Sequence, residues 1–154
     1  YDLRIAARDA KLGFVFVRRG VMPELSSTWI LPRLIGVAKA NELLLTGRIF
    51  LGEEAAELGV VNEAVDAREV LPRAMEIARD IATNAAPASV ALTKRIIWRN
   101  LAEPDPSRAA RNEGQAFAWL GKQADAKEGV VSFLEKREPN WKLSPSSAPD
   151  FDGA

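Results

Sequence analysis

The feature that most limits the fold is the confinement of strand-like sequence to a few short blocks. Residues 2–7 place apolar side chains on one face, and residues 11–17, KLGFVFV, are rich in β-branched and aromatic residues. A further small strand is predicted at residues 60–65. Because a two-stranded piece is not a stable sheet by itself, the first two strands need a pairing partner. We expect it to be a segment preceding Tyr1 or another chain.

Helical patterns cover most of the sequence after residue 36. Glycine or proline stands near many of the predicted helix ends, where these residues stop or start helical backbone. The Ala86-Pro87 pair is expected to break one helix, since the residue before a proline resists helical geometry. The helices are predicted at residues 37–46, 52–58, 69–84, 89–101, 106–121 and 125–137.

These patterns divide the chain into three parts. Residues 1–66 hold the strands and the loop segment 17–36, and residues 67–138 form a helical region. Residues 139–154 are rich in Ser, Pro, Asp and Gly, and we expect them to be disordered. The sequence opens within a strand and without a methionine, which is typical of the later part of a longer polypeptide.

Two absences in the composition exclude several kinds of chemistry. The 154 residues contain neither cysteine nor histidine, so thiol nucleophiles, disulfides, histidine-based triads and most zinc sites are excluded. Basic and acidic residues both number 21, so no net field favours nucleic acid or an anionic membrane. No long apolar run or signal-peptide pattern is present, and we expect a cytoplasmic protein without a metal site.

Residues 17–36, VRRGVMPELSSTWILPRLIG, are the segment best suited to chemistry. Gly20 and Pro23 fix the approach to a helix that begins near residues 26–28, where a hydroxyl side chain can cap the unpaired amides. Glu24 then lies beside the positive end of a helix, which favours its ionised form. A carboxylate held in this way can move protons. On local sequence alone, an ordinary surface acid is the commoner explanation.

Four blocks of sequence, in order, carry a family resemblance. They are DLRIAARDAKLGFVFVRRGVMPELSSTWILPRLIGVAKANELLLTGR, EEAAELGVVNEAV, ASVALTKR and DAKEGVVSFLEKREPNW. Together they resemble the C-terminal portion of the crotonase superfamily, the enoyl-CoA hydratases and isomerases, from Asp2 to about Trp141. The resemblance implies an α/β fold, α+β by content here, in which the end of a ββα spiral precedes a helical region that builds homo-trimers or hexamers.

The resemblance also implies the substrate and the intermediate. Family members bind an acyl-CoA thioester, need no further cofactor, and hold an enolate oxygen with two backbone N–H groups. Those amides would lie before Tyr1, so a missing N-terminal segment is expected to supply them. Hydratases of the family use two glutamates around a water. The first would also precede Tyr1, and Phe16, which cannot activate water, stands at the position of the second.

Glu24 matches the catalytic glutamate of peroxisomal-type Δ3,Δ2-enoyl-CoA isomerases and the nucleophilic aspartate of 4-chlorobenzoyl-CoA dehalogenase. The resemblance therefore implies double-bond isomerisation, in which Glu24 takes a proton from C2 and returns it at C4. Substrate contacts are expected at five further positions. Phe16, Met22 and Trp29 are expected to form an apolar wall, Phe133 to lie near the acyl end, and Lys136 to lie near the CoA phosphates. Core packing is the alternative for the apolar wall, and a solvated surface position is the alternative for Lys136.

Two other functions stay open. The protein is a 2-enoyl-CoA hydratase if an upstream glutamate activates water. Alternatively, the 154-residue chain is a catalytically silent fragment or assembly module, because the oxyanion segment and the partners of its strands are missing from it.

Overall fold

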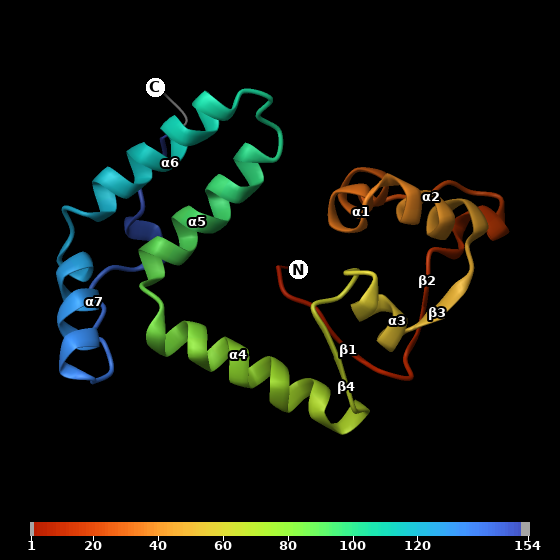
Figure 1. The fold of residues 1–154 in the computed structure, drawn as a ribbon, viewed down its shortest axis with the longest axis horizontal. Helices are drawn as coiled ribbons and strands as arrows, with labels where there is room; N and C mark the ends of the chain where they lie inside the picture. Colours follow the sequence, from red (N-terminus) through yellow and green to blue (C-terminus); the bar gives the residue numbers. More distant parts are fainter. Residues whose placement is uncertain (1, 152–154) are drawn as a thin grey trace. The chain divides into compact units, whose positions relative to one another are not determined.

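The computed structural model describes residues 2–151, and its contacts divide the chain into two units, Tyr1–Glu76 and Ile77–Ala154 (Figure 1). The last three residues of the predicted tail lie outside the described residues. The division falls later than the boundary expected after residue 66. The reason is that the first turns of the following helix remain tied to the first unit, where Arg73 Nε donates to Glu63 Oε2 at 2.8 Å.

Seven α-helices and four short strands are found within residues 2–151. The strands are β1 (Ile5–Ala7), β2 (Lys11–Gly13), β3 (Ile49–Leu51) and β4 (Glu63–Val65). The helices are α1 (Ser27–Ile35), α2 (Val37–Thr46), α3 (Gly52–Glu57), α4 (Val70–Asn84), α5 (Pro87–Asn100), α6 (Pro106–Leu120) and α7 (Ala124–Glu135). Three 3₁₀ turns complete the pattern: η1 (Val15–Arg19), η2 (Ala67–Glu69) and η3 (Pro145–Ser147).

Each of the first two strands pairs with a later segment of the same chain. β1 pairs in parallel with β4, from Ile5 opposite Glu63 to Ala7 opposite Val65. β2 pairs antiparallel with β3, with Leu12 opposite Phe50. The prediction that the partners come from outside the chain was therefore wrong for these pairs. It overlooked residues 49–51 altogether and did not assign residues 60–65 as the partner of the first strand.

The strand predicted over residues 11–17 ends at Gly13. Phe14 leaves the extended conformation, with φ −99° and ψ 62°, and the 3₁₀ turn η1 follows. The ladder stops here because its partner strand β3 begins at Ile49, directly after the turn that ends α2. Arg18 in η1 donates from Nε to the carbonyl of Thr46 at 2.7 Å, which places a cation at the C-terminus of α2.

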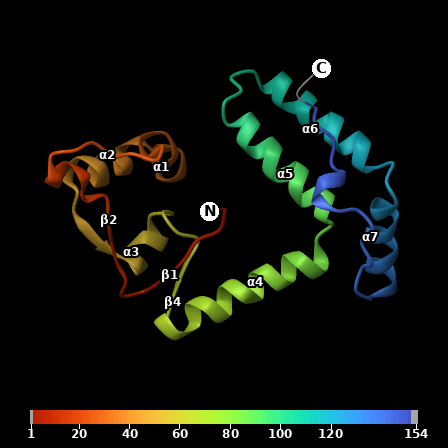
Figure 2. The same ribbon diagram turned by 180° about the vertical axis from the view of Figure 1, so that it is seen from behind.

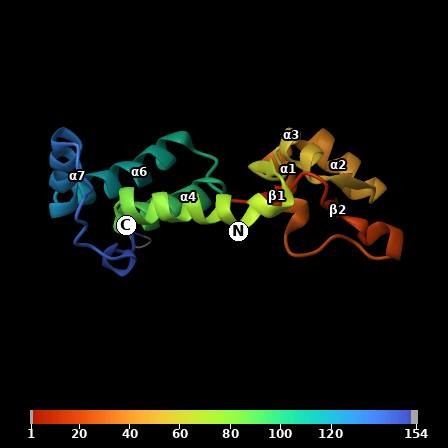
Figure 3. The same ribbon diagram turned by 90° about the horizontal axis from the view of Figure 1, so that it is seen from below.

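The core of the first unit lies between its helices and strands. α1, α2 and α3 are grouped together in the ribbon (Figure 3), and the ring of Phe14 stacks on that of Phe50 at 6.2 Å between centroids. Full burial of a large aliphatic side chain stabilises a fold by about 1.5–3 kcal/mol, so this cluster dominates the packing of the unit. Its buried members are Leu31, Ala40, Leu43, Leu44, Phe50, Ala55 and Val61.

Gly52 lies at a close approach between two backbone segments of the first unit. Its N–H donates to the carbonyl of Ala10 at 2.9 Å, and the next amide, of Glu53, donates to the carbonyl of Arg8 at 3.0 Å. A Cβ on Gly52 would lie 1.9 Å from the carbonyl oxygen of Ala7. Only glycine fits at this position, because any side chain would overlap the backbone at the end of β1.

Arg48 joins three elements of the first unit. Its guanidinium donates to Glu42 of α2 at 2.8 Å and to Glu54 of α3, while its own backbone lies just before β3. The hydrogen bond from Arg48 holds the pKa of Glu54 below its usual range. For Glu42, Lys39 lowers the pKa most and Arg48 adds to the effect.

The second unit is built from helices with few buried side chains. α5 and α6 lie side by side (Figure 2), and α4 buries no residue. The helices were predicted to within a few residues at each end. The helix break predicted at Ala86-Pro87 is confirmed: α4 ends at Asn84, Ala86 is extended with φ −62° and ψ 122°, and Pro87 lies in the first turn of α5, where a backbone N–H has no helical partner to lose. The residues of this unit that are buried are Ala88, Leu92, Ala116, Asp125 and Ser132.

Residues 139–151 differ from the disordered tail that the composition predicted. Trp141 Nε1 donates to the carbonyl of Thr83 at 3.1 Å. The carboxylate of Asp125 accepts two successive backbone amides, of Lys142 at 2.8 Å and of Leu143 at 3.1 Å. Through these hydrogen bonds the backbone of the tail has defined partners. Composition alone does not reveal them.

Replacing Asp125 with asparagine is expected to lower the free energy of unfolding by about 1–3 kcal/mol. Asp125 is only 5% exposed, and an amide side chain has one oxygen for two backbone donors, so its NH₂ would face an N–H. Urea unfolding followed by tryptophan fluorescence measures the change. Asp105→Asn is the control, because Asp105 caps α6 through Ser107 N and asparagine caps equally well. Equal stability of the two variants would contradict the role of Asp125.

Candidate functional site

Glu24 lies at the start of a tight, strained turn that leads into α1. Leu25 and Ser26 follow it with φ of +53° and +58°. This left-handed conformation costs a residue other than glycine on the order of 1–3 kcal/mol. Both the N–H and the Oγ of Ser27 donate to the carbonyl oxygen of Glu24, at 3.0 and 2.7 Å. The turn therefore fixes the backbone from which the Glu24 side chain extends.

The helix start predicted near residues 26–28 is confirmed, but the capping hydrogen bond is not of the expected kind. Ser26, the residue before α1, makes no capping bond through its side chain. Such a bond usually requires extended backbone at that position, and Ser26 is left-handed instead. Its carbonyl accepts the amides of Trp29 and Ile30, both at 2.9 Å. The Ser27 hydroxyl, meanwhile, turns back to Glu24.

The carboxylate of Glu24 is exposed, and no hydrogen bond or ion pair of it is found within residues 2–151. Apolar side chains flank it in sequence. Met22 is 72% exposed and Leu25 is 86% exposed. A carboxylate that is not committed to an ion pair, on a fixed backbone, can take up and return a proton.

The first unit also holds three of the predicted substrate contacts. Phe16 lies in η1 and is half-buried. Met22 is exposed, so core packing does not explain it in this chain. Trp29 lies on α1 under the guanidinium of Arg33, which is 3.9 Å from the ring centroid and also donates from Nη1 to the Trp29 carbonyl at 2.9 Å. The arginine holds the indole against the helix surface.

Phe133 and Lys136 belong to the second unit, at the end of α7. Phe133 is 81% exposed. Lys136 ends the helix in a left-handed conformation, with φ +54°, and its N–H donates to the Phe133 carbonyl at 3.3 Å. The structure thus places these two positions together, in a unit other than that of Glu24.

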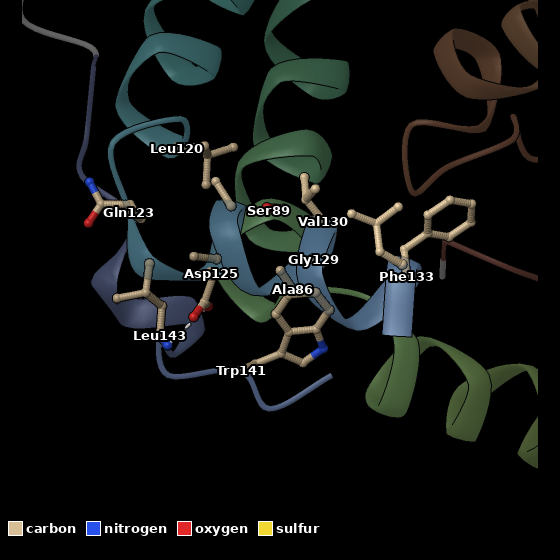
Figure 4. A pocket seen from close by; sticks show the side chains of 13 residues that line it. Ala86, Ser89, Leu120, Gln123, Asp125, Gly129, Val130, Phe133, Trp141 and Leu143 are labelled. Carbon is tan, nitrogen blue, oxygen red and sulfur yellow. Dashed lines mark hydrogen bonds between the residues drawn. The ribbon is translucent and has the colours of Figure 1, made fainter. Parts of the chain in front are cut away.

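Sequence reasoning did not identify a pocket of about 400 Å³ in the second unit (Figure 4). Trp141 and Leu143 of the tail form part of the wall of this pocket. Because the tail was expected to be disordered, no pocket was predicted there. The spacing of Ala126, Val130 and Phe133 along α7 was the available signal, since these residues share one helix face. The lining residues are Ala86, Ala88, Ser89, Leu120, Gln123, Asp125, Ala126, Gly129, Val130, Phe133, Leu134, Trp141 and Leu143.

A second pocket, of about 380 Å³, lies in the first unit and is lined by charged side chains. Its arginines already have carboxylate partners. Arg8 lies 3.8 Å from Asp66, and Arg73 donates to Glu63 and also to Glu76, at 2.7 Å. Pairing with Glu63 raises the pKa of Arg73. The Arg73–Glu63 pair connects α4 to β4, and the pocket has no apolar wall comparable to that of the first one.

No cluster of three or more acidic, histidine or cysteine side chains within residues 2–151 has the arrangement of a metal site. Nor does any helix in this part of the chain combine the length and the apolar character needed to cross a membrane.

Comparison with known proteins gives consistent matches. The family model described as enoyl-CoA hydratase/isomerase matches residues 1–144. Enoyl-CoA hydratase ACTT3 of Alternaria alternata is 42% identical over 142 residues, which are 92% of this chain and 47% of that protein. Crotonyl-CoA hydratase of Syntrophomonas wolfei is 38% identical over 140 residues, covering 91% of this chain and 53% of that protein. The chain spans about half the length of the curated relatives it matches.

Solved structures agree with this result. Enoyl-CoA hydratase from Bacillus anthracis matches with a TM-score of 0.86 and 38% identity, over 92% of this chain and 54% of that one. Enoyl-CoA hydratase EchA1 from Mycobacterium marinum matches with a TM-score of 0.81 and 37% identity, over 91% and 55%. The mixed arrangement of helices and small sheets described above is therefore the one found in these crotonase-fold structures.

Proposed function

Because the chain belongs to the enoyl-CoA hydratase/isomerase family, we propose that the protein acts on an enoyl-CoA thioester and that Glu24 moves a proton of the acyl chain. The reaction is isomerisation of a 3-enoyl-CoA to a 2-enoyl-CoA. The observation that carries it is the Glu24 turn, in which a backbone clamped by Ser27 presents a carboxylate with no partner among residues 2–151.

The chemistry needs one base. The Glu24 carboxylate takes a proton from C2, and the C–H electron pair moves into the thioester to give an enolate. The electrons then return through the former double bond, and C4 takes the same proton from the carboxylic acid. Atoms and charge balance without a metal, a redox cofactor or a second substrate, so the CoA thioester is the only cofactor-like group required.

Water must be kept from the proton while Glu24 holds it. Exposed apolar side chains of Met22 and Leu25 flank the carboxylate in sequence, and Val21 and Trp29 are also exposed. We assign Met22 and Trp29, with Phe16, to an apolar wall that is completed by a covering segment. The two oxyanion amides belong to residues outside this sequence. In the second unit, Phe133 is assigned to the acyl end and Lys136 to the CoA phosphates.

A homo-trimer or hexamer is the proposed assembly. Several large apolar side chains on the helices of the second unit are exposed in the single chain, and burial against a second copy would remove them from water. These residues are Ile97, Trp98, Phe117, Val130 and Leu134.

Hydration of a 2-enoyl-CoA is the second candidate. The names of the two curated relatives above favour it, since both are hydratases. Phe16 disfavours it, because phenylalanine occupies the position of one of the two hydratase glutamates and cannot hold a water. Hydration would then rely on an upstream glutamate.

Mass spectrometry of the products separates these functions. The protein, purified at its native length, is incubated in D₂O with a 3-enoyl-CoA and, separately, with a 2-enoyl-CoA. If one carboxylate shielded from water carries out the isomerisation, the proton removed from C2 should appear as protium at C4 of the 2-enoyl-CoA product. Exchange with D₂O would replace it with deuterium. A dominant 3-hydroxyacyl-CoA product would establish hydration instead. Absence of both products would favour a catalytically silent assembly module.

A further inference from the structure

The turn that follows Glu24 is strained, so other contacts must hold it in place. Leu25 and Ser26 are consecutive left-handed residues, and neither is glycine. Leu25 is 86% exposed, so its side chain packing cannot stabilise this conformation. The hydrogen bonds that close the turn both come from Ser27, whose N–H and Oγ meet the same carbonyl oxygen, that of Glu24. Ser27 is half-buried, which reduces competition from water for these bonds.

The segment before Glu24 is also restrained. The amide of Val21 donates to the carbonyl of Phe16 at 3.2 Å, and the amide of Gly20 donates to the carbonyl of Val17 at 3.3 Å. Pro23 fixes its own φ, directly before the glutamate. The backbone of Glu24 is therefore held on both sides, while its carboxylate remains free of any partner within residues 2–151.

We propose that Ser27 is the positioning residue for Glu24. Its doubled hydrogen bond keeps the strained turn closed and fixes the Cα from which the carboxylate swings. Such a pivot lets one side chain serve two carbon atoms of the substrate by rotation about its own χ angles, without backbone movement. The inference rests on the proposed function of Glu24 and adds to it a group that does not touch the substrate.

Alanine and threonine at position 27 test the proposal. Ser27→Ala removes the 2.7 Å bond and keeps the backbone N–H. It is expected to lower kcat for 3-enoyl-CoA isomerisation by about ten- to hundredfold, with KM within about twofold, because misplacement of a catalytic group affects the chemical step. Ser27→Thr retains the hydroxyl and should restore most of kcat. Thr28→Ala, which removes an exposed hydroxyl one residue further along α1, should behave as wild type.

Adding Leu25→Gly to Ser27→Ala provides a second test if Ser27→Ala folds poorly. Glycine adopts the left-handed conformation without strain, and the exposed leucine contributes little packing, so the double variant Leu25→Gly/Ser27→Ala should fold and close the turn more readily than Ser27→Ala alone. The expected result is a partial recovery of kcat relative to Ser27→Ala, at unchanged KM.

The outcomes distinguish this proposal from the proposed function. If Glu24→Gln removes activity while Ser27→Ala keeps the wild-type kcat, Glu24 is catalytic and Ser27 does not position it. An effect on KM alone, or no rescue by threonine, would likewise overturn the positioning role. If Glu24→Gln is fully active, the proposed function itself fails.

Discussion

Glutamine at position 24 is expected to reduce kcat for double-bond isomerisation by about a thousandfold, which is the middle of the range for loss of a general acid–base group. Glutamine keeps the length and shape of the side chain but cannot accept the C2 proton. KM should change little, because binding of the thioester does not depend on this proton transfer. The side chain is exposed and makes no bond within residues 2–151, so the fold should not be affected.

The measurement is a steady-state assay of 3-enoyl-CoA conversion, with circular dichroism to verify folding. Glu57→Gln is the matched control, since Glu57 is an exposed glutamate of the same unit, on α3. It should have wild-type kinetics. A Glu24→Gln variant as active as Glu57→Gln would exclude Glu24 from the mechanism. Loss of isomerisation with hydration retained would show that water is activated elsewhere.

Alanine at position 52 is expected to destabilise the fold by about 3 kcal/mol or more, at the upper end of overpacking effects. The new Cβ would lie 1.9 Å from the carbonyl oxygen and 3.0 Å from the carbonyl carbon of Ala7. These are backbone atoms, which cannot rotate away as the end of a side chain can. To make room, α3 must separate from β1, which weakens the hydrogen bonds from Gly52 to Ala10 and from Glu53 to Arg8.

Gly114→Ala is the control for this substitution. Gly114 lies within α6, and a Cβ there would meet no atom within 4 Å. Alanine should stabilise the helix by about 0.5–1 kcal/mol, because glycine loses more backbone entropy on folding. Thermal unfolding followed by circular dichroism compares the variants. If Gly52→Ala is as stable as Gly114→Ala, the approach between Gly52 and Ala7 is not rigid.

Helix ends were the most predictable part of the fold. Gly36 and Gly47 bracket α2 at the expected residues, because both have positive φ, which glycine adopts without strain. Pro106 begins α6 as expected. The strand prediction failed after Gly13, because β propensity reflects side-chain packing and carries no information about where the partner strand ends.

The turn that carries Glu24 was predictable in position but not in detail. The order of Pro23, Glu24 and the serines indicates a turn before a helix, and the structure has one there. The left-handed backbone of Leu25 and Ser26 could not be predicted, since neither residue type favours it. The ordered tail was missed for a related reason: composition rules count residue types and do not register that one carboxylate, that of Asp125, accepts two amides distant in sequence.

The parallel pairing of β1 with β4 has a consequence for biosynthesis. Ile5 emerges from the ribosome long before Glu63, the residue opposite it. Until that later segment is translated, the hydrogen-bonding edge of the nascent β1 has no β4 to cover it. During this interval β1 can pair with a strand of another polypeptide. A chaperone that binds extended peptide segments would prevent this pairing.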